Sequence, residues 1–242
     1  MTAADISVPM GAAPWPRCVA PMTFDLIGIL KALAVRRPIF HSEADFQHAL
    51  AWIIHERHPD FVVRLEYRPN KLKKKTYIDI WLEHAGMICA IELKYKTRCL
   101  QVVAGGEPFD LLDQSAQDIA RYDFCKDIER IEALACAYPG MFGFAVLLTN
   151  DRGYWQRSGR DGNVDSAFRV HEAAKLTGTL EWAGHASAGT TKGRTSAICL
   201  IGEYSLKWMD YSKGGDRGNS QFRIAVASVV PVAHTPAETT TS

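Results

Sequence analysis

The sequence lacks several of the local motifs by which enzyme classes are usually assigned. Its six cysteines are scattered, with no Cys-x-x-Cys pair, so we expect reduced thiols rather than a disulfide framework. No Gly-x-Ser-x-Gly elbow is present, and residues 189–193 lack the contiguous Gly-Lys-Ser/Thr of a phosphate-binding loop. The formal net charge is only +1 over 242 residues. Any basic surface for nucleic acid must therefore be local.

Long hydrophobic runs are also missing, as is a basic segment followed by an apolar stretch. We therefore expect no signal peptide and no membrane span, and a cytoplasmic protein. Residues 1–22 carry four prolines and are expected to form a flexible extension. Residues 233–242 are rich in threonine and are expected to be a disordered tail. The chain as a whole is 47% hydrophobic and 23% charged, which is typical of a globular domain.

Hydrophobic periodicity predicts an α/β domain in residues 23–150. A short amphipathic helix is expected over 23–35, and Ser42 with Asp45 forms a capping box at the start of a second helix. The following elements are expected in order: a helix over Ser42–His58, strands over Phe61–Tyr67, Thr76–Leu82 and Met87–Lys94, a loop over 97–108, a long helix over Phe109–Ala137, and an apolar strand over Phe142–Thr149. A central mixed sheet flanked by helices follows from this order.

Residues 151–232 give weaker signals and are expected to be a β-rich extension that packs on the core. A short helix is expected near 166–176, and three strands over Ala197–Ile201, Tyr204–Tyr211 and Gln221–Val230. These strands either extend the central sheet or supply contacts to a substrate.

The chemically informative residues lie on two neighbouring strands. Strand side chains alternate between faces, so Glu92 and Lys94 share one face of their strand. If Ala85-Gly86 is a two-residue hairpin turn, Asp79 falls directly opposite Glu92. Two carboxylates this close repel one another, and a divalent cation would resolve the conflict. Because Mg²⁺ prefers carboxylate oxygens, the pair predicts metal-assisted hydrolysis of a phosphodiester, with Lys94 assisting the water.

Glu43 is a third acidic candidate, at the head of the helix that begins after Ser42. It lies on the same stripe as Phe46 and Leu50, which are expected to face the sheet. A carboxylate in the first turn of a helix is also favoured by the helix dipole alone, without any active site. The neighbourhood of Asp79 and Glu92 favours the functional interpretation.

This arrangement resembles the PD-(D/E)XK nuclease superfamily, which has the restriction-endonuclease-like fold. The resemblance covers about residues 39–150, and its key string is Asp79, twelve residues, then Glu92-Leu93-Lys94. It implies that Asp79 and Glu92 bind Mg²⁺, for which Mn²⁺ can substitute. It further implies that Lys94 assists the nucleophilic water, and that Glu43 is an auxiliary acid. A restriction-endonuclease-like core (helix, three strands, helix, strand) is the fold it implies.

Several polar residues near the predicted site could contact a nucleic acid. A basic stretch precedes the second strand, further basic residues follow Lys94, and two glutamines lie near the start of the long helix. These candidates are Lys71, Lys73, Lys74, Lys75, Lys96, Gln114 and Gln117. A solvated hairpin tip explains the lysines equally well, and polar surface positions explain the glutamines.

Two functional hypotheses remain open. The first is an Mg²⁺-dependent endonuclease acting on DNA, with a homodimer as one possible assembly. The second is a nucleic-acid-binding or protein-binding module that keeps the fold without turnover. A solvent-facing edge with cross-strand charge pairs is the non-functional alternative for Asp79, Glu92 and Lys94.

Overall fold

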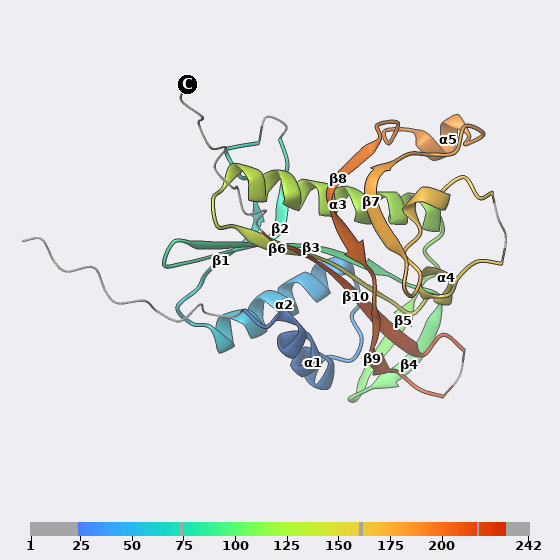
Figure 1. Ribbon diagram of the computed structural model, residues 1–242. Coiled ribbons are helices and arrows are strands. Elements are labelled where there is room, and N and C mark those ends of the chain that lie inside the picture. Colours follow the sequence, from blue (N-terminus) through green and yellow to red (C-terminus); the bar gives the residue numbers. More distant parts are fainter. Residues whose placement is uncertain (1–23, 73–74, 160–161, 217, 231–242) are drawn as a thin grey trace, which may run out of the picture.

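The computed structural model describes residues 24–72, 75–159, 162–216 and 218–230, and contains a six-stranded mixed sheet between two layers of helix (Figure 1). The strand order is β1-β2-β3-β6-β10-β9. Only β3 and β6 run parallel; the other neighbours are antiparallel. The bounds are β1 Val62–Tyr67, β2 Ile78–His84, β3 Met87–Lys96, β6 Phe142–Thr149, β9 Trp208–Lys213 and β10 Gln221–Val229. The expected α/β class with a mixed central sheet is confirmed.

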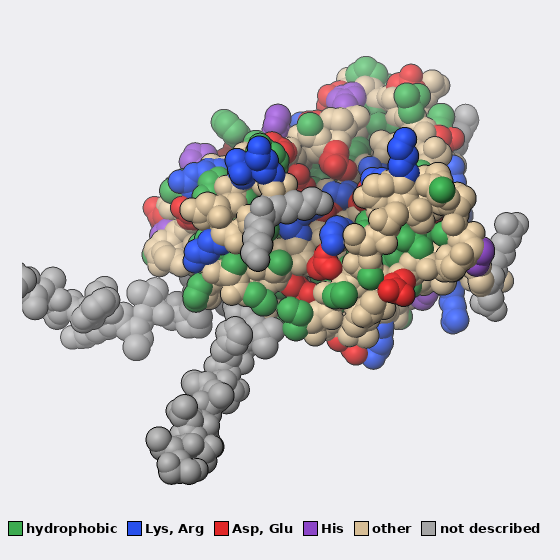
Figure 2. Space-filling view, turned by 90° about the horizontal axis from the view of Figure 1, so that it is seen from above, with side chains coloured by type: hydrophobic (Ala, Val, Ile, Leu, Met, Phe, Trp, Pro, Cys, Tyr) green, Lys and Arg blue, Asp and Glu red, His purple; other side chains and the backbone are tan. Residues whose placement is uncertain are grey.

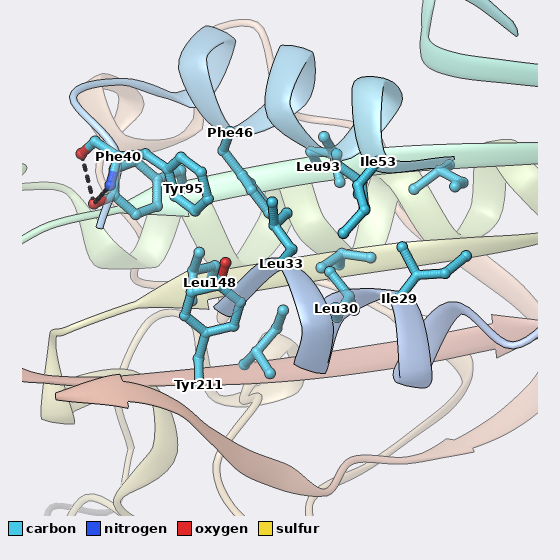
Figure 3. Packing of buried hydrophobic residues seen from close by; sticks show 14 of the residues in the cluster. Ile29, Leu30, Leu33, Phe40, Phe46, Ile53, Leu93, Tyr95, Leu148 and Tyr211 are labelled. Atoms are coloured by element: carbon cyan, nitrogen blue, oxygen red, sulfur yellow. Dashed lines mark hydrogen bonds between the residues drawn. The ribbon is translucent and has the colours of Figure 1, made fainter. Parts of the chain in front are cut away.

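Two helices cover one face of the sheet. They are α1 (Leu26–Arg36) and α2 (Glu43–Arg57). The Ser42 hydroxyl caps α2 by accepting a hydrogen bond from the Asp45 N–H at 3.1 Å, as the capping box predicts. Figure 3 shows side chains of α1 and α2, such as Leu33 and Phe46, packing against Leu148 and Tyr211 of the sheet. This apolar layer fixes the distance between α2 and β3.

A single long helix, α3 (Gln117–Ala137), covers the other face, as Figure 1 shows. The alternation along β3 separates the two layers. Leu93 and Tyr95 belong to the apolar cluster under α1 and α2, whereas Glu92 and Lys94 face α3. The predicted separation of polar and apolar faces on this strand is confirmed.

The segment between β3 and α3 differs from the expected loop and helix start. It forms a hairpin of β4 (Leu100–Ala104) and β5 (Glu107–Leu111), and α3 begins only at Gln117. Gly105 and Gly106 both have positive φ, which is the geometry of a two-residue hairpin turn. The core therefore has two strands more than the expected order of helix, three strands, helix and strand.

The C-terminal part contributes two strands to the central sheet. β10 pairs with β6 along its length, and β9 pairs with β10. The other two strands, β7 (Lys175–Leu180) and β8 (Ile198–Ser205), form a separate two-stranded ribbon against α3. The short helices are α4 (Arg152–Trp155), α5 (Ala188–Thr191) and a 3₁₀ turn over Ser166–Phe168.

Two expectations for the C-terminal part are corrected. The helix expected near 166–176 is reduced to the 3₁₀ turn, since β7 already begins at Lys175. The strand expected over 204–211 is divided between β8 and β9, which belong to different sheets. None of the helices in the described ranges is long and apolar enough to cross a bilayer. The expected extension at 1–22 and the tail at 233–242 lie outside the described residues.

Candidate active site

Asp79 and Glu92 lie just beyond the paired part of β2 and β3. The register pairs His84 with Met87 and continues to Ile80 with Ile91, where the ladder ends. Asp79 and Glu92 are the next residues on the two strands. The turn between the strands has the predicted two residues, Ala85 and Gly86, both with positive φ. The predicted turn and the pairing of His84 with Met87 are confirmed, and the direct opposition of the two carboxylates stays a prediction.

Two carboxylates cap the edge of β3 beyond the point where β2 stops pairing with it. Asp79 Oδ2 accepts a hydrogen bond from the Leu93 N–H at 2.6 Å. Glu43 Oε2 accepts one from the Tyr95 N–H at 2.8 Å. Successive N–H groups on one edge of a strand are roughly 6.7 Å apart, so this capping gathers Glu43 and Asp79 at one end of the sheet. The functional interpretation of Glu43 gains a structural basis here.

Gln47 is a buried site residue that the sequence analysis missed. It lies one helical turn after Glu43 on α2. Its Nε2 donates to the Asp79 backbone carbonyl at 2.7 Å and to Glu66 Oε1 at 2.8 Å. Gln47 therefore fixes the start of β2 against α2. Its signal in the sequence is a polar residue within the otherwise apolar stripe of that helix.

Lys94 is held by an acid from α3. Its Nζ lies 2.7 Å from Asp127 Oδ2, and the two side chains are 16% and 4% exposed. Although burial disfavours the charged lysine, the carboxylates of Asp127 and Glu43 hold the pKa of Lys94 above its usual range. The ion pair with Asp127 thus favours the charged form of Lys94.

Arg130, also on α3, links the two ends of the cluster. Its Nη1 pairs with Glu92 Oε1 and lies 3.0 Å from Asp127 Oδ1. Glu92, Arg130, Asp127 and Lys94 thus form one chain of ion pairs between β3 and α3. Asp127 and Arg130 were missed by the sequence analysis. Their signal is a pair of charges, three residues apart, on a helix face that is otherwise apolar.

The electrostatics of the site favour an additional cation. Burial raises the pKa of Asp79 to about 6, with the nearby acids adding to the effect and Leu93 N–H and Lys94 opposing it. Burial and the charge of Asp127 raise the pKa of Glu92 well above its usual range, with Arg130 opposing. Both shifts mean that the folded site disfavours two ionised carboxylates. A bound cation would relieve this repulsion.

The donor set fits a two-carboxylate Mg²⁺ site. Asp79 Oδ1 and Glu92 Oε2 have no hydrogen-bond partner among the described residues. Mg²⁺ commonly takes one or two protein carboxylates and completes its shell with water and phosphate oxygens. Within the described ranges no three His, Cys, Asp or Glu side chains converge into a protein-only metal site. Binding of Mg²⁺ by Asp79 and Glu92 therefore stays a prediction.

The predicted nucleic-acid contacts separate into different regions. Lys96 joins the cluster, with its Nζ 3.8 Å from Glu43 Oε2. Lys75 borders a cleft that Arg130 also lines. Lys71 instead donates to the Ala137 carbonyl at 3.1 Å and lies over the Tyr138 ring. Lys73 and Lys74 lie outside the described residues.

The two glutamines do not contact the cluster. Gln114 precedes α3 rather than lying in it; it is exposed, and its N–H donates to the Thr97 carbonyl at 2.8 Å. Gln117 is the first residue of α3, and its side chain donates to the Asp151 carboxylate. Both positions follow from the late start of the helix. The surface explanation fits Gln114, whereas Gln117 has a structural partner.

The four residues Glu43, Asp79, Glu92 and Lys94 are therefore brought to one end of β3, with Gln47, Asp127 and Arg130 completing the cluster. Comparison with family models, with curated proteins and with solved structures finds no match to this chain.

Proposed function

We propose that this protein is a metal-dependent nuclease that hydrolyses phosphodiester bonds in DNA, with a site of the PD-(D/E)XK type. The observation that carries the proposal is the gathering of carboxylates at β3, where Asp79 accepts from the Leu93 N–H and lies one position beyond the last β2–β3 pair, beside Glu92 and Lys94 of β3. Glu43 adds a carboxylate at the same edge of β3. The chain order of these residues is the one that the resemblance to this superfamily implies.

Each of these residues has a proposed role that follows from its contacts. Asp79 and Glu92 would hold Mg²⁺, or Mn²⁺ in its place, and the ion would supply Lewis-acid chemistry at the scissile phosphate. Lys94, kept charged by Asp127, orients the attacking water and stabilises developing negative charge. A lysine with a raised pKa is a poor proton acceptor. This supports a role for Lys94 as a cation rather than as a general base.

A non-catalytic binding module is the second candidate, and one observation favours it. Arg130 already neutralises Glu92, and Asp127 already neutralises Lys94. A cluster that satisfies its own charges can serve structure alone, joining α3 to β3. In that case the fold would bind nucleic acid or another protein without cleaving it.

Cleavage of supercoiled plasmid separates the two candidates. The wild type is incubated with Mg²⁺, Mn²⁺ or EDTA beside Glu92→Gln and the control Glu83→Gln. Glu83 lies on β2 and pairs with Arg64 outside the cluster. We expect metal-dependent nicking or linearisation by the wild type and the control, and a loss of roughly 10²–10³-fold in Glu92→Gln because a ligand carboxylate is removed. Circular dichroism checks that each variant is folded.

The opposite result is plasmid that stays intact with every metal while its mobility is retarded by the wild type. That outcome would contradict the nuclease proposal and support the binding module. Equal cleavage by Glu92→Gln and the wild type would place the activity elsewhere on the molecule.

A further inference from the structure

A cleft of about 620 Å³ lies beside the candidate active site on the α3 side. Its walls are the segment preceding β2, the exposed side of α3 and the segment at 193–196 that precedes β8. Figure 1 shows the α5–β8 region rising beside α3. Four basic and two acidic residues line the cleft: Lys75, Lys126, Arg130, Arg194, Asp123 and Glu129.

The surface around this cleft is not uniformly charged. Figure 2, which views the molecule from above, shows Lys and Arg side chains interspersed with Asp and Glu. Inside the cleft, Arg194 makes a two-pronged pair with Asp123 at 2.6 and 2.7 Å, and Lys126 pairs with Glu129. These two pairs cancel. Of the two remaining basic residues, Lys75 has no ion pair among the described residues, whereas Arg130 is paired with Glu92 and Asp127 at the edge of the site.

Arg130 connects the cleft to the buried carboxylates. Its Nη1 points inward and pairs with the carboxylates of Glu92 and Asp127. Its Nε and Nη2 have no hydrogen-bond partner among the described residues, and neither atom is buried. The side chain is 27% exposed and lines the cleft. The Nε–Nη2 edge of a guanidinium is a fork that matches two oxygens of a phosphate.

Resting on the nuclease function proposed above, we propose that the DNA backbone lies in this cleft and that the free edge of Arg130 binds the phosphate next to the reacting one. Lys75 holds the backbone farther along the cleft. Arg130 is thereby a phosphate-binding residue that touches the substrate and, through Nη1, positions Glu92. The proposed nuclease site of Asp79, Glu92, Lys94 and Glu43 assigns neither role to Arg130.

Binding without turnover is the direct test. A fluorescent 20-base-pair duplex is titrated in EDTA against the wild type, Arg130→Lys and Lys75→Ala, over a series of salt concentrations. Arg130→Lys keeps a positive charge beside Glu92 but removes the fork. The double control Lys31→Ala/Lys213→Ala removes two lysines that line a different hollow, on the α1 side of the sheet.

We expect Arg130→Lys to weaken binding at least about tenfold, the value of a hydrogen bond to a charged group. Lys75→Ala should weaken binding uniformly across duplex sequences and reduce the salt slope by about one. The double control should bind like the wild type. If Arg130→Lys fails to fold, the proposal is tested by the salt dependence of the binding affinity of Lys75→Ala.

Wild-type affinity and salt slope in both Arg130→Lys and Lys75→Ala would overturn the cleft proposal. If the wild type still cleaves plasmid in Mg²⁺ in that case, the nuclease function stands and the substrate reaches the site from another side. If the wild type does not cleave but the cleft variants lose affinity, the nuclease function fails while the cleft is supported as a DNA-binding groove.

Discussion

Lys94 and Asp127 form an ion pair that is withdrawn from water on both sides. The pair joins the strand with the candidate site to the long helix, and Arg130 extends it to Glu92. A buried charge that loses its partner is costly, because the desolvation of the remaining charge is no longer offset. The candidate active site is therefore also a structural joint between β3 and α3.

The coupling free energy between Lys94 and Asp127 can be measured by a double-mutant cycle. We expect Asp127→Asn to lower the free energy of unfolding by about 3 kcal/mol, because it leaves Lys94 buried without its main partner. The double variant Lys94→Met/Asp127→Asn should lose less free energy of unfolding than the two single variants lose together. The difference, which is the coupling energy of the pair, should be at least about 1 kcal/mol. Urea denaturation followed by circular dichroism gives each value.

The exposed pair of Arg64 and Glu83 on β1 and β2 is the matched control for this cycle. Its partners are 42% and 37% exposed, so the coupling between them should stay within about 1 kcal/mol. A coupling between Lys94 and Asp127 as small as this one would show that the buried pair does not join β3 to α3.

The β2–β3 hairpin is the element that sets the geometry of the site. Its two-residue turn puts Ala85 at φ 47° and Gly86 at φ 84°. A turn of this length pairs His84 with Met87 and Ile80 with Ile91, and a shift of one residue in this register would turn the side chains of one strand to the opposite face. The turn chemistry is imperfect, since alanine tolerates a positive φ poorly whereas asparagine and glycine adopt it readily.

Substitution at this turn should therefore change stability in opposite directions. Ala85→Asn is expected to raise the free energy of unfolding by about 0.5–1 kcal/mol. Gly86→Ala is expected to lower it by about 1 kcal/mol, although a Cβ there would meet no atom within 4 Å. Thermal and urea unfolding measure both. Destabilisation by Ala85→Asn would argue against this turn geometry.

At the scale of the whole molecule, the C-terminal strands complete both faces of the sheet. Phe222 and Ile224 of β10 join the apolar cluster under α1 and α2. Ala225 and Val229 of the same strand join the cluster under α3. Without β10, the fully apolar strand β6 would lose the hydrogen-bonding partner along one edge. The part of the chain that carries the candidate site thus depends on residues more than seventy positions later.

We therefore expect residues 24–150 alone not to fold into a stable domain. Exposed apolar surface and an unpaired edge on β6 should give aggregation or a disordered spectrum. Far-UV circular dichroism and ¹H–¹⁵N correlation spectra of this fragment, compared with residues 24–230, test the expectation. A cooperative unfolding transition in the shorter fragment would contradict it.

Local periodicity was enough to predict the elements that surround the site. Three of these patterns depend only on neighbours within a few residues: the capping box at Ser42, the alternation along β3 and the apolar run of β6. They can therefore be predicted from a single sequence. The facing of Glu92 and Lys94 toward α3 and the two-residue turn between β2 and β3 follow from the same local rules. The β4–β5 hairpin was missed even though its Gly105-Gly106 turn is a local signal.

Tertiary structure alone decided which partners these residues meet. Asp127 and Arg130 lie more than thirty residues after Glu92 and Lys94, and only the packing of α3 on the sheet brings them together. The insertion of β10 beside β6 depends likewise on the burial of apolar surface between segments far apart in the chain. Periodicity reports which face of an element is apolar, whereas the free energy of burial depends on everything that packs against that face. The sequence by itself therefore determined the candidate residues and their strands, and the fold determined their charges, their partners and the cleft beside them.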